Sequence, residues 1–507
     1  MKNAFQFVFI LTISLSLYLV SKAQNSLSEC YVNTSNNISF NSSDKELNEV
    51  FTWAKKQALA YAFEEDAVGQ WYEAALPGRE VFCMRDVSHQ AMGAHFLGLA
   101  NHTKNMLLKF AGNVSDKRDW CSLWEITRHG TPALQDYLND EEFWYNLPAN
   151  FDILDCCFRM YNLTGDQAYL NDSVFLNFYK RTVYDYVERW DVSIDKVMNR
   201  DRWLNNSPEN NRRFKTNRGI PGYHEGDDGY IASLDLLTTQ QAAFEAYAQI
   251  QGLRCNDNEA LTFFSKADEI KEFVTKEWWD KNNQQFYTHV GKDHLLKSRG
   301  FDYSTLYFGS FSDSIKLRKT LSGLLDFLPK QSTQFIEGLS HLPEVLYHCE
   351  EPELARDMLL SVLKSERKEY PEASFCTVGA MVAGLMGVEM EEYPSISSIE
   401  TGQFGEQLFI TKSRLTAQTE WAEINHVPIK RNDISVRHEG KTKSTLINNS
   451  GPQLQWKACF QGVFKSMKLN GNPVESRIET LLINGEKITW VWAVVGAGET
   501  MTIEAIK

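Results

Sequence analysis

From about residue 47 to residue 390, apolar residues recur at the spacing of an α-helix, and this pattern constrains the fold more than any other feature. Segments 44–63, 228–250, 256–280 and 352–366 carry apolar residues at i, i+3, i+4 and i+7. Clusters of Gly, Pro, Asn and Asp separate such segments at intervals typical of helical hairpins. The repetition predicts a toroid or solenoid of helical hairpins, and it excludes a coiled coil because no heptad persists.

The pattern changes after about residue 396. Apolar and polar residues now alternate, and Asn-Gly pairs at 470–471 and 484–485 mark tight turns. Such a region of about a hundred residues is typical of an antiparallel β-sandwich. We therefore expect a helical domain over residues 24–395 and a small β-sandwich domain over residues 396–507.

The first 23 residues have the pattern of a cleavable signal peptide. Lys2 supplies a positive charge, an apolar run covers residues 5–20, and Ser21-Lys22-Ala23 is a small-x-small cleavage site. The apolar run is short for a membrane-spanning helix, which needs roughly 20 residues. The mature chain is therefore expected in the periplasm or outside the cell, with no later segment inserted in a membrane.

The net charge of −14 excludes two classes of partner. Nucleic acids and anionic membrane surfaces are bound through Lys and Arg, and here acidic residues outnumber them. The nine Cys are an odd number, so at least one of them is unpaired within the chain. We expect buried thiols with one or two disulfides. Their spacing fits no zinc motif, so we expect neither a metal nor a cofactor.

Three polar segments interrupt the helical pattern where loops are expected, and loops on a rigid scaffold commonly carry function. The first is residues 78–90, which place Arg85, Asp86 and His89 among apolar neighbours, just ahead of a helix starting near Val87. The simpler interpretation is that Asp86 caps this helix and Arg79 pairs with Glu80.

The second segment, residues 218–230, holds Glu225, Asp227 and Asp228 within four positions, next to Tyr223 and His224. Three carboxyl groups this close repel one another, which raises the pKa of at least one of them. A raised pKa is the condition for a general acid near neutral pH. Calcium binding is the alternative, although the spacing is not that of an EF-hand loop.

The third segment, residues 368–388, places Glu369 and Glu372 on either side of a proline before a helix rich in small residues. Glu372 would then face the interior or a cavity, or it would serve only as a first-turn partner of the helix dipole. A nearby segment, 334–345, adds Glu337 and His341.

The second and third segments are about 145 residues apart, so only a closed ring of helices would bring their carboxyl groups together. Two carboxyl groups that face each other across a sugar are the requirement for glycoside hydrolysis. One donates a proton to the leaving oxygen, and the other activates water or attacks the anomeric carbon.

The sequence resembles a known clan in these same segments. "PGREVFCMRDVSHQAMGAHFLGL" resembles the signature of the six-hairpin, (α/α)6-barrel glycoside hydrolases, with the trehalase pattern closest in shape. "GYHEGDDGY" is similar to the general-acid loop of trehalases and α-glucosidases, and to a loop of α-L-rhamnosidases in which Gly229 replaces a Trp. "EYPEASFCTVGAMVAGL" is similar to the last inner helix, whose preceding loop carries the general base.

The resemblance implies a mainly α fold, an (α/α)6 toroid with a C-terminal β-sandwich, and an exo-acting glycosidase that inverts the anomeric centre. It assigns Asp228 as the acid, with Asp227 or Glu225 as substitutes, and Glu372 as the base, with Glu369 next. It implies that the sugar is bound by charge-assisted hydrogen bonds beside an apolar wall. It assigns Arg85, Asp86 and His89 as ligands of the non-reducing sugar. Further candidates for substrate binding are Asp227, Tyr223, His224, Glu337 and Trp144.

Two other functions remain open. A polysaccharide lyase or unsaturated-uronide hydrolase on the same toroid could use Tyr223, His224, Arg218 and His89. A non-catalytic carbohydrate-binding protein would need none of the carboxyl groups. The sugar itself stays open because Met84-Arg85-Asp86-Val87 stands where trehalases have Trp-Asp-Ser.

Overall fold

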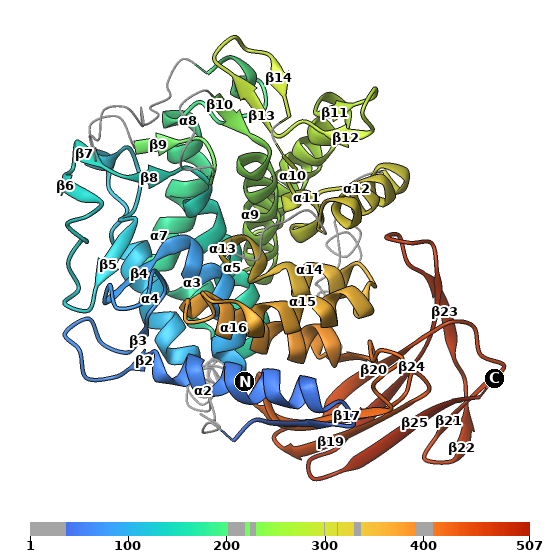
Figure 1. The fold of residues 1–507 in the computed structure, drawn as a ribbon. Coiled ribbons are helices and arrows are strands. Elements are labelled where there is room, and N and C mark those ends of the chain that lie inside the picture. The colour runs from blue at the N-terminus through green and yellow to red at the C-terminus, as the bar shows by residue number, and fades with distance from the viewer. Residues whose placement is uncertain are drawn as a thin grey trace, which may run out of the picture.

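A computed structural model describes residues 37–200, 218–223, 230–298, 300–311, 313–328, 336–390 and 409–506. A mainly helical part comes first in the chain, and two β-sheets form the C-terminal part (Figure 1). This succession agrees with the sequence prediction. Within the described ranges, no helix is both long and apolar enough to cross a membrane.

The main helices lie where the apolar spacing predicted them. Segments 44–63, 256–280 and 352–366 form α2, α10 and α15. Asp44 begins α2 by accepting hydrogen bonds from the backbone N–H groups of Glu46 and Leu47. The described helices are α2 (Lys45–Ala60), α3 (Met84–Phe96), α4 (Ala100–Gly112), α5 (Pro148–Thr164), α6 (Ala168–Asn171), α7 (Ser173–Lys180), α8 (Val187–Arg189), α9 (Leu234–Leu253), α10 (Asp257–Glu277), α11 (Ser304–Tyr307), α12 (Ser314–Phe327), α13 (Ile336–Leu339), α14 (Leu342–His348), α15 (Pro352–Lys364) and α16 (Pro371–Gly379).

Short strands connect several of these helices. They form two- and three-stranded ribbons at the helix ends. The strands are β2 (Ala62–Phe63), β3 (Trp71–Tyr72), β4 (Val81–Cys83), β5 (Glu125–Thr127), β6 (Tyr137–Asn139), β7 (Glu142–Phe143), β8 (Tyr145–Asn146), β9 (Arg218–Ile220), β10 (Tyr230–Ser233), β11 (Trp279–Asp280), β12 (Gln285–Phe286), β13 (His289–Gly291) and β14 (Leu296–Lys297).

Four buried helices form the centre of the helical part. Helix α3 packs against α16 and α5, and α5 packs against α9. Helix α9 departs from the amphipathic pattern predicted for segment 228–250, because even Gln240 and Gln241 are buried. The reason is that α5, α10 and α11 all pack against it.

The C-terminal part contains two sheets. One has the strand order β1-β17-β18-β19-β25-β21-β22, and the other has the order β15-β16-β20-β24-β23. The Asn470-Gly471 turn joins β21 to β22, as predicted. The strands are β1 (Ser39–Ser42), β15 (Glu389–Met390), β16 (Phe409–Lys412), β17 (Trp421–Ile429), β18 (Asn432–Glu439), β19 (Lys443–Ser450), β20 (Leu454–Gln461), β21 (Ser466–Leu469), β22 (Asn472–Val474), β23 (Arg477–Thr480), β24 (Lys487–Val495) and β25 (Thr500–Ile506).

Two features of these sheets differ from the sequence expectation. Strand β16 pairs with β20 in parallel, so the pairing is not antiparallel throughout. Strand β1, from the N-terminal end of the described chain, pairs with β17 at the edge of the larger sheet. The four residues of β1 and the two residues of β15 were expected in the helical domain but belong to these sheets, and the expected boundary at residue 395 lies outside the described residues.

Most of the described cysteines are buried thiols. Cys156 and Cys157, adjacent on α5, are both buried and free. Burial raises the pKa of Cys156 to about 12, so this group stays protonated at neutral pH. The same state is found for Cys121, Cys349, Cys376 and Cys459, while Cys255 is an exposed free thiol. The expectation of buried thiols therefore holds for the described cysteines other than Cys255, and none of the described cysteines forms an expected disulfide.

Two buried histidines join the helical part to the larger sheet. His95 on α3 donates its Nε2–H to the carbonyl oxygen of Pro428 on β17, at 2.9 Å. His438 on β18 donates in the opposite direction, to the carbonyl oxygen of Met386, also at 2.9 Å. Burial lowers the pKa of both imidazoles to about 4, so both are neutral in the fold at neutral pH.

This arrangement predicts a pH-dependent stability. In the unfolded chain a histidine titrates near 6.5, so between pH 6.5 and 4 the unfolded state binds more protons than the folded state. The free energy of unfolding therefore contains a contribution that is complete above pH 6.5 and falls as the pH drops towards 4. His438→Gln keeps an N–H donor without titrating, so its Tm should fall less steeply over this range. Equal slopes of Tm against pH for the wild-type protein and His438→Gln would contradict the assignment of His438 as neutral in the fold.

Candidate active site

The candidate site is built on a close crossing of α3 and α16. Gly93 makes this crossing possible, because a Cβ on it would lie 1.9 Å from the carbonyl oxygen of Phe375. Gly379 is the matching residue on α16, where a Cβ would lie 3.1 Å from Met92 Cε. The crossing places His89, one turn before Gly93, beside Glu372 in the first turn of α16.

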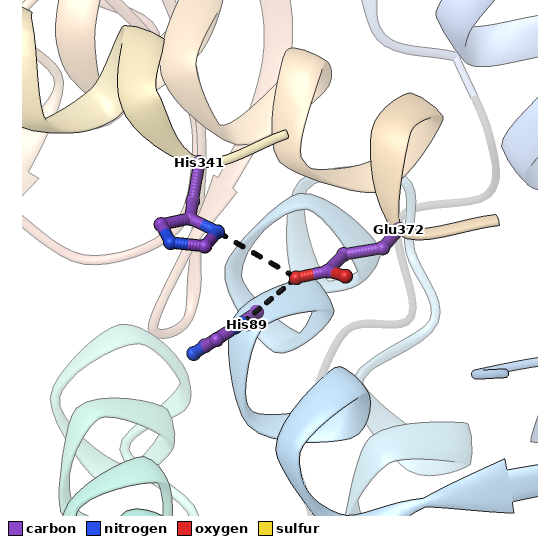
Figure 2. Close-up of side chains that lie close together, drawn as sticks. All are labelled: His89, His341 and Glu372. Carbon is purple, nitrogen blue, oxygen red and sulfur yellow. Dashed lines mark hydrogen bonds and ion pairs between the residues drawn. The ribbon is translucent and has the colours of Figure 1, made fainter. Parts of the chain in front are cut away.

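Glu372 lies between two imidazole rings (Figure 2). Its Oε1 is 2.8 Å from His89 Nδ1 and 3.7 Å from His341 Nδ1. Glu372 is fully buried, and the side chains of both histidines are 9% exposed. Because an ionised carboxylate can only accept hydrogen bonds, His89 donates its Nδ1–H and keeps a lone pair on Nε2.

Electrostatics support this protonation state. Burial alone would raise the pKa of Glu372, but the imidazoles of His341 and His89 outweigh it and hold the pKa well below its usual range. Burial lowers the pKa of His89 to about 4, although its hydrogen bond to Glu372 acts in the other direction. At neutral pH the pair is therefore a carboxylate and a neutral imidazole.

The two histidines line a cavity of about 350 Å³ whose walls are largely apolar and include several aromatic residues. Its volume falls in the range of small-molecule sites, and such sites are mostly apolar with a few convergent polar groups. The aromatic residues on its wall are Tyr223, Phe301, Tyr303, Tyr307, Phe308 and Phe327. The polar residues are Arg85, His89, Asp235, Thr239, Asp302, Ser304, Glu337 and His341.

Tyrosines fix the orientation of the His341 ring. The hydroxyl of Tyr303 hydrogen-bonds His341 Nε2, and the Tyr307 ring meets both His89 and His341 edge-on at 5.8 Å between centroids. Both tyrosines come from the short helix α11 or the residue just before it. Sequence reasoning missed them; the available signal was the aromatic run "FDYSTLYF" at 301–308, between two helical segments.

A second polar group lies around Arg85. Its guanidinium is 5.5 Å from the centre of the Tyr223 ring, and the Tyr223 hydroxyl hydrogen-bonds the buried carboxyl group of Asp152. Burial raises the pKa of Asp152 to about 7, so this carboxyl group is close to half-protonated at neutral pH. Asp152 was also missed, because its position within the continuous helical pattern of α5 looks like that of any helix residue.

Asp86 has a role different from the helix cap that was the simpler interpretation. Helix α3 begins at Met84, and its N-cap residue makes no side-chain hydrogen bond. The Asp86 carboxyl group instead accepts a hydrogen bond from the Tyr370 hydroxyl, and its Oδ2 is 3.9 Å from Arg85 Nε. Burial raises its pKa to about 6. Arg79 likewise does not pair with Glu80 as that interpretation expected; it contacts Glu125 and Asp136.

The predicted site residues divide into three groups. Those that line the cavity are Arg85, His89, Tyr223 and Glu337, of which Glu337 also forms an ion pair with Arg367. Those described elsewhere are Glu372 and Asp86, buried behind the wall, Glu369, which is exposed, and Trp144, which is half-buried and hydrogen-bonded to Asn146. His224, Glu225, Asp227 and Asp228 lie outside the described residues, so their assignment stays a prediction.

His89, His341 and Glu372 are also a donor set of the kind that binds transition metals, with ligand atoms all within 4.8 Å of one another. In a tetrahedral zinc site with bonds of about 2.0–2.1 Å, the ligand atoms lie roughly 3.4 Å apart. The 2.8 Å between His89 Nδ1 and Glu372 Oε1 is shorter and is a normal hydrogen-bond length. The geometry therefore favours a hydrogen-bonded cluster.

Comparison with known proteins identifies the fold. No protein-family model and no curated protein matches the sequence. An α-L-rhamnosidase from Dictyoglumus thermophilum matches 93% of this chain with a TM-score of 0.61 and 13% identity. A GH78 family rhamnosidase from Bacillus sp. GL1 matches 82% with a TM-score of 0.50 and 15% identity, and a structure described as a sialidase matches 89% with a TM-score of 0.53 and 10% identity.

These similarities show a rhamnosidase-like glycosidase fold, as the resemblance of the three polar segments implied. This chain spans 51% of the length of the first structure, 40% of the second and 41% of the third. At these identities the comparison concerns the fold.

The helix crossing yields a prediction. Gly93→Ala should push α3 away from α16, lower the Tm by several degrees and weaken any binding or activity of the cavity, because Phe375 O leaves no room for a methyl group. Gly112→Ala on α4 is the matched control, since its Cβ would meet only Val174 Cγ1 at an ordinary 3.6 Å. Thermal unfolding of both variants checks this, and an equal Tm for both would argue against the close crossing.

Proposed function

We propose that this chain is an exported, exo-acting glycosidase that removes a terminal sugar with inversion, using a carboxylic acid on one side of the sugar and the Glu372–His89 pair on the other. The observation that carries the proposal is the position of that pair. A neutral imidazole on the wall of a cavity large enough for a monosaccharide is hydrogen-bonded to an ionised carboxylate buried behind it.

The cavity lining supports a sugar as the ligand. Aromatic rings such as Tyr303 and Tyr307 offer apolar faces to the C–H groups of a pyranose, while Arg85, Asp302 and Glu337 offer charged hydrogen bonds to its hydroxyl groups. A cavity of about 350 Å³ accommodates one or two sugar rings rather than a long chain, which favours removal of a terminal unit.

The acid is proposed in segment 225–228, with Asp228 first. Tyr223, the last described residue before this segment, lines the cavity. This proposal also requires the helices to close into the (α/α)6 toroid, since the acid segment and α16 are far apart in sequence. Tyr223 already bridges part of that separation through its contacts with Asp152 on α5 and Arg85 on α3.

The proposal is tested by a screen of aryl glycosides and oligosaccharides that includes α-L-rhamnosides, α-glucosides and β-glucuronides. We expect reducing-sugar release on one of these classes, and ¹H NMR of the first product should show the inverted anomer. Formation of an unsaturated product instead of hydrolysis would establish the lyase alternative, and the retained anomer would contradict inversion.

A matched pair of variants tests the assignment of Asp228 as the general acid. Asp228→Asn should lose about 10²–10⁴-fold in turnover on a substrate with a poor leaving group and less on an activated aryl glycoside, because only the former needs protonation. Asp293→Asn, an exposed carboxylate paired with Lys297 in the β13–β14 hairpin, serves as the control. Wild-type turnover in Asp228→Asn would show that the acid lies elsewhere.

A further inference from the structure

Resting on the proposed glycosidase function, we infer that His89 is the residue that removes the proton from the attacking water, and that Glu372 acts through it as a positioning residue. The clan resemblance assigns the base role to the carboxylate itself. The arrangement of the two side chains around the cavity assigns it to the imidazole.

Access to the cavity separates the two residues. His89 lines the cavity, whereas Glu372 is fully buried and is not among the described residues on its wall. The Oε1 of Glu372 is engaged by His89 Nδ1, and its Oε2 is buried without a hydrogen-bond partner in the described part of the chain. A water in the cavity therefore meets the imidazole before it meets the carboxylate.

The free nitrogen of His89 has the properties of a base. Its Nδ1–H is held by Glu372, so the lone pair is on Nε2. Within the described ranges Nε2 makes no hydrogen bond, and it is not among the atoms sealed from solvent. The carboxylate behind the ring fixes the tautomer and stabilises the imidazolium that forms, the role a carboxylate has in other carboxylate–histidine pairs.

His341 is less suited to this role. Its Nε2 is engaged by the Tyr303 hydroxyl, and its Nδ1 faces Glu372 and the Ser340 hydroxyl, at 3.7 and 3.4 Å. Both of its nitrogens therefore have neighbours within the protein. Among the described residues, the charged and titratable groups that face His89 are Glu372 from α16, His341 from the turn before α14, Arg85 from its own helix and Tyr307 from α11.

The proposed step is a single displacement at the anomeric carbon. Water transfers a proton to His89 Nε2 while its oxygen forms a bond to the anomeric carbon. The glycosidic C–O bond breaks, and the leaving oxygen keeps the bonding electrons and receives a proton from the general acid. The imidazolium then returns its proton through solvent to the ionised acid, so the net reaction consumes one water molecule.

Chemical rescue tests the inference, with a substrate from the class that the wild-type protein hydrolyses fastest. His89→Ala should lower kcat by about 10²–10⁴-fold with a smaller change in KM, and added imidazole should restore part of the lost rate. Glu372→Ala should not be rescued by azide. Rescue of Glu372→Ala by azide with formation of a glycosyl azide would identify Glu372 as the direct base and overturn the inference.

The chain offers a matched control in His426. Its Nδ1 is 2.9 Å from Asp433 Oδ2, almost the same geometry, but the pair is partly exposed on the C-terminal sheet. His426→Ala should keep wild-type kcat and respond to neither imidazole nor azide.

A metal at the site is tested separately. Loss of activity on chelation of metals by EDTA, restored by zinc, would also overturn the inference, since the cluster of His89, His341 and Glu372 would then hold a metal.

A measurement without substrate separates this inference from the proposed function. ¹⁵N NMR of the histidines should show His89 as the neutral Nδ1–H tautomer at pH 7, with that proton shifted in Glu372→Gln. Should the wild-type protein hydrolyse no glycoside, the proposed function fails while this tautomer still stands. The Nε2–H tautomer of His89 would overturn the inference, whether or not the protein hydrolyses a glycoside.

Discussion

The geometry of the candidate site depends on how closely α3 and α16 approach each other. Gly93 allows a backbone contact with Phe375 that even a methyl group would prevent, and Gly379 lies opposite it on α16. Only at this separation does His89 reach Glu372, a partner 283 positions away in sequence. The hydrogen bond between them fixes the tautomer of His89, while burial keeps its imidazole neutral. Tyr303 and Tyr307 complete the wall in front of them. Backbone packing thus determines the chemistry.

The fold and the site place different demands on buried histidines. His95 and His438 are buried neutral and bond to backbone carbonyl groups, so they connect the helical part to the sheet. His89 is buried neutral as well, but it bonds to a carboxylate and keeps one nitrogen towards a cavity. The partner and the remaining access, rather than the burial, distinguish a structural histidine from a candidate base.

Local periodicity made much of the architecture predictable. Helical spacing identified α2, α10 and α15, strand alternation identified the C-terminal sheets, and the polar interruptions identified the region of Arg85, His89 and Glu372. Long-range pairing was not predictable, since nothing in residues 39–42 indicates that they join β17, and nothing in Asp152 indicates its contact with Tyr223. The imidazole partners of Glu372 were not predictable for the same reason, because they come from distant segments.

The proposed activity requires that His89, with Glu372 behind it, lies at the wall of a sugar-binding cavity. The most direct measurement follows the ¹⁵N and ¹H shifts of the histidine side chains while L-rhamnose, D-glucose and D-glucuronate are titrated in turn. We expect a sugar that binds to change the chemical shift of His89 Nε2 until the change saturates, and to leave the shifts of His426 unchanged. Sugar binding detected by calorimetry with no change at His89 would contradict it.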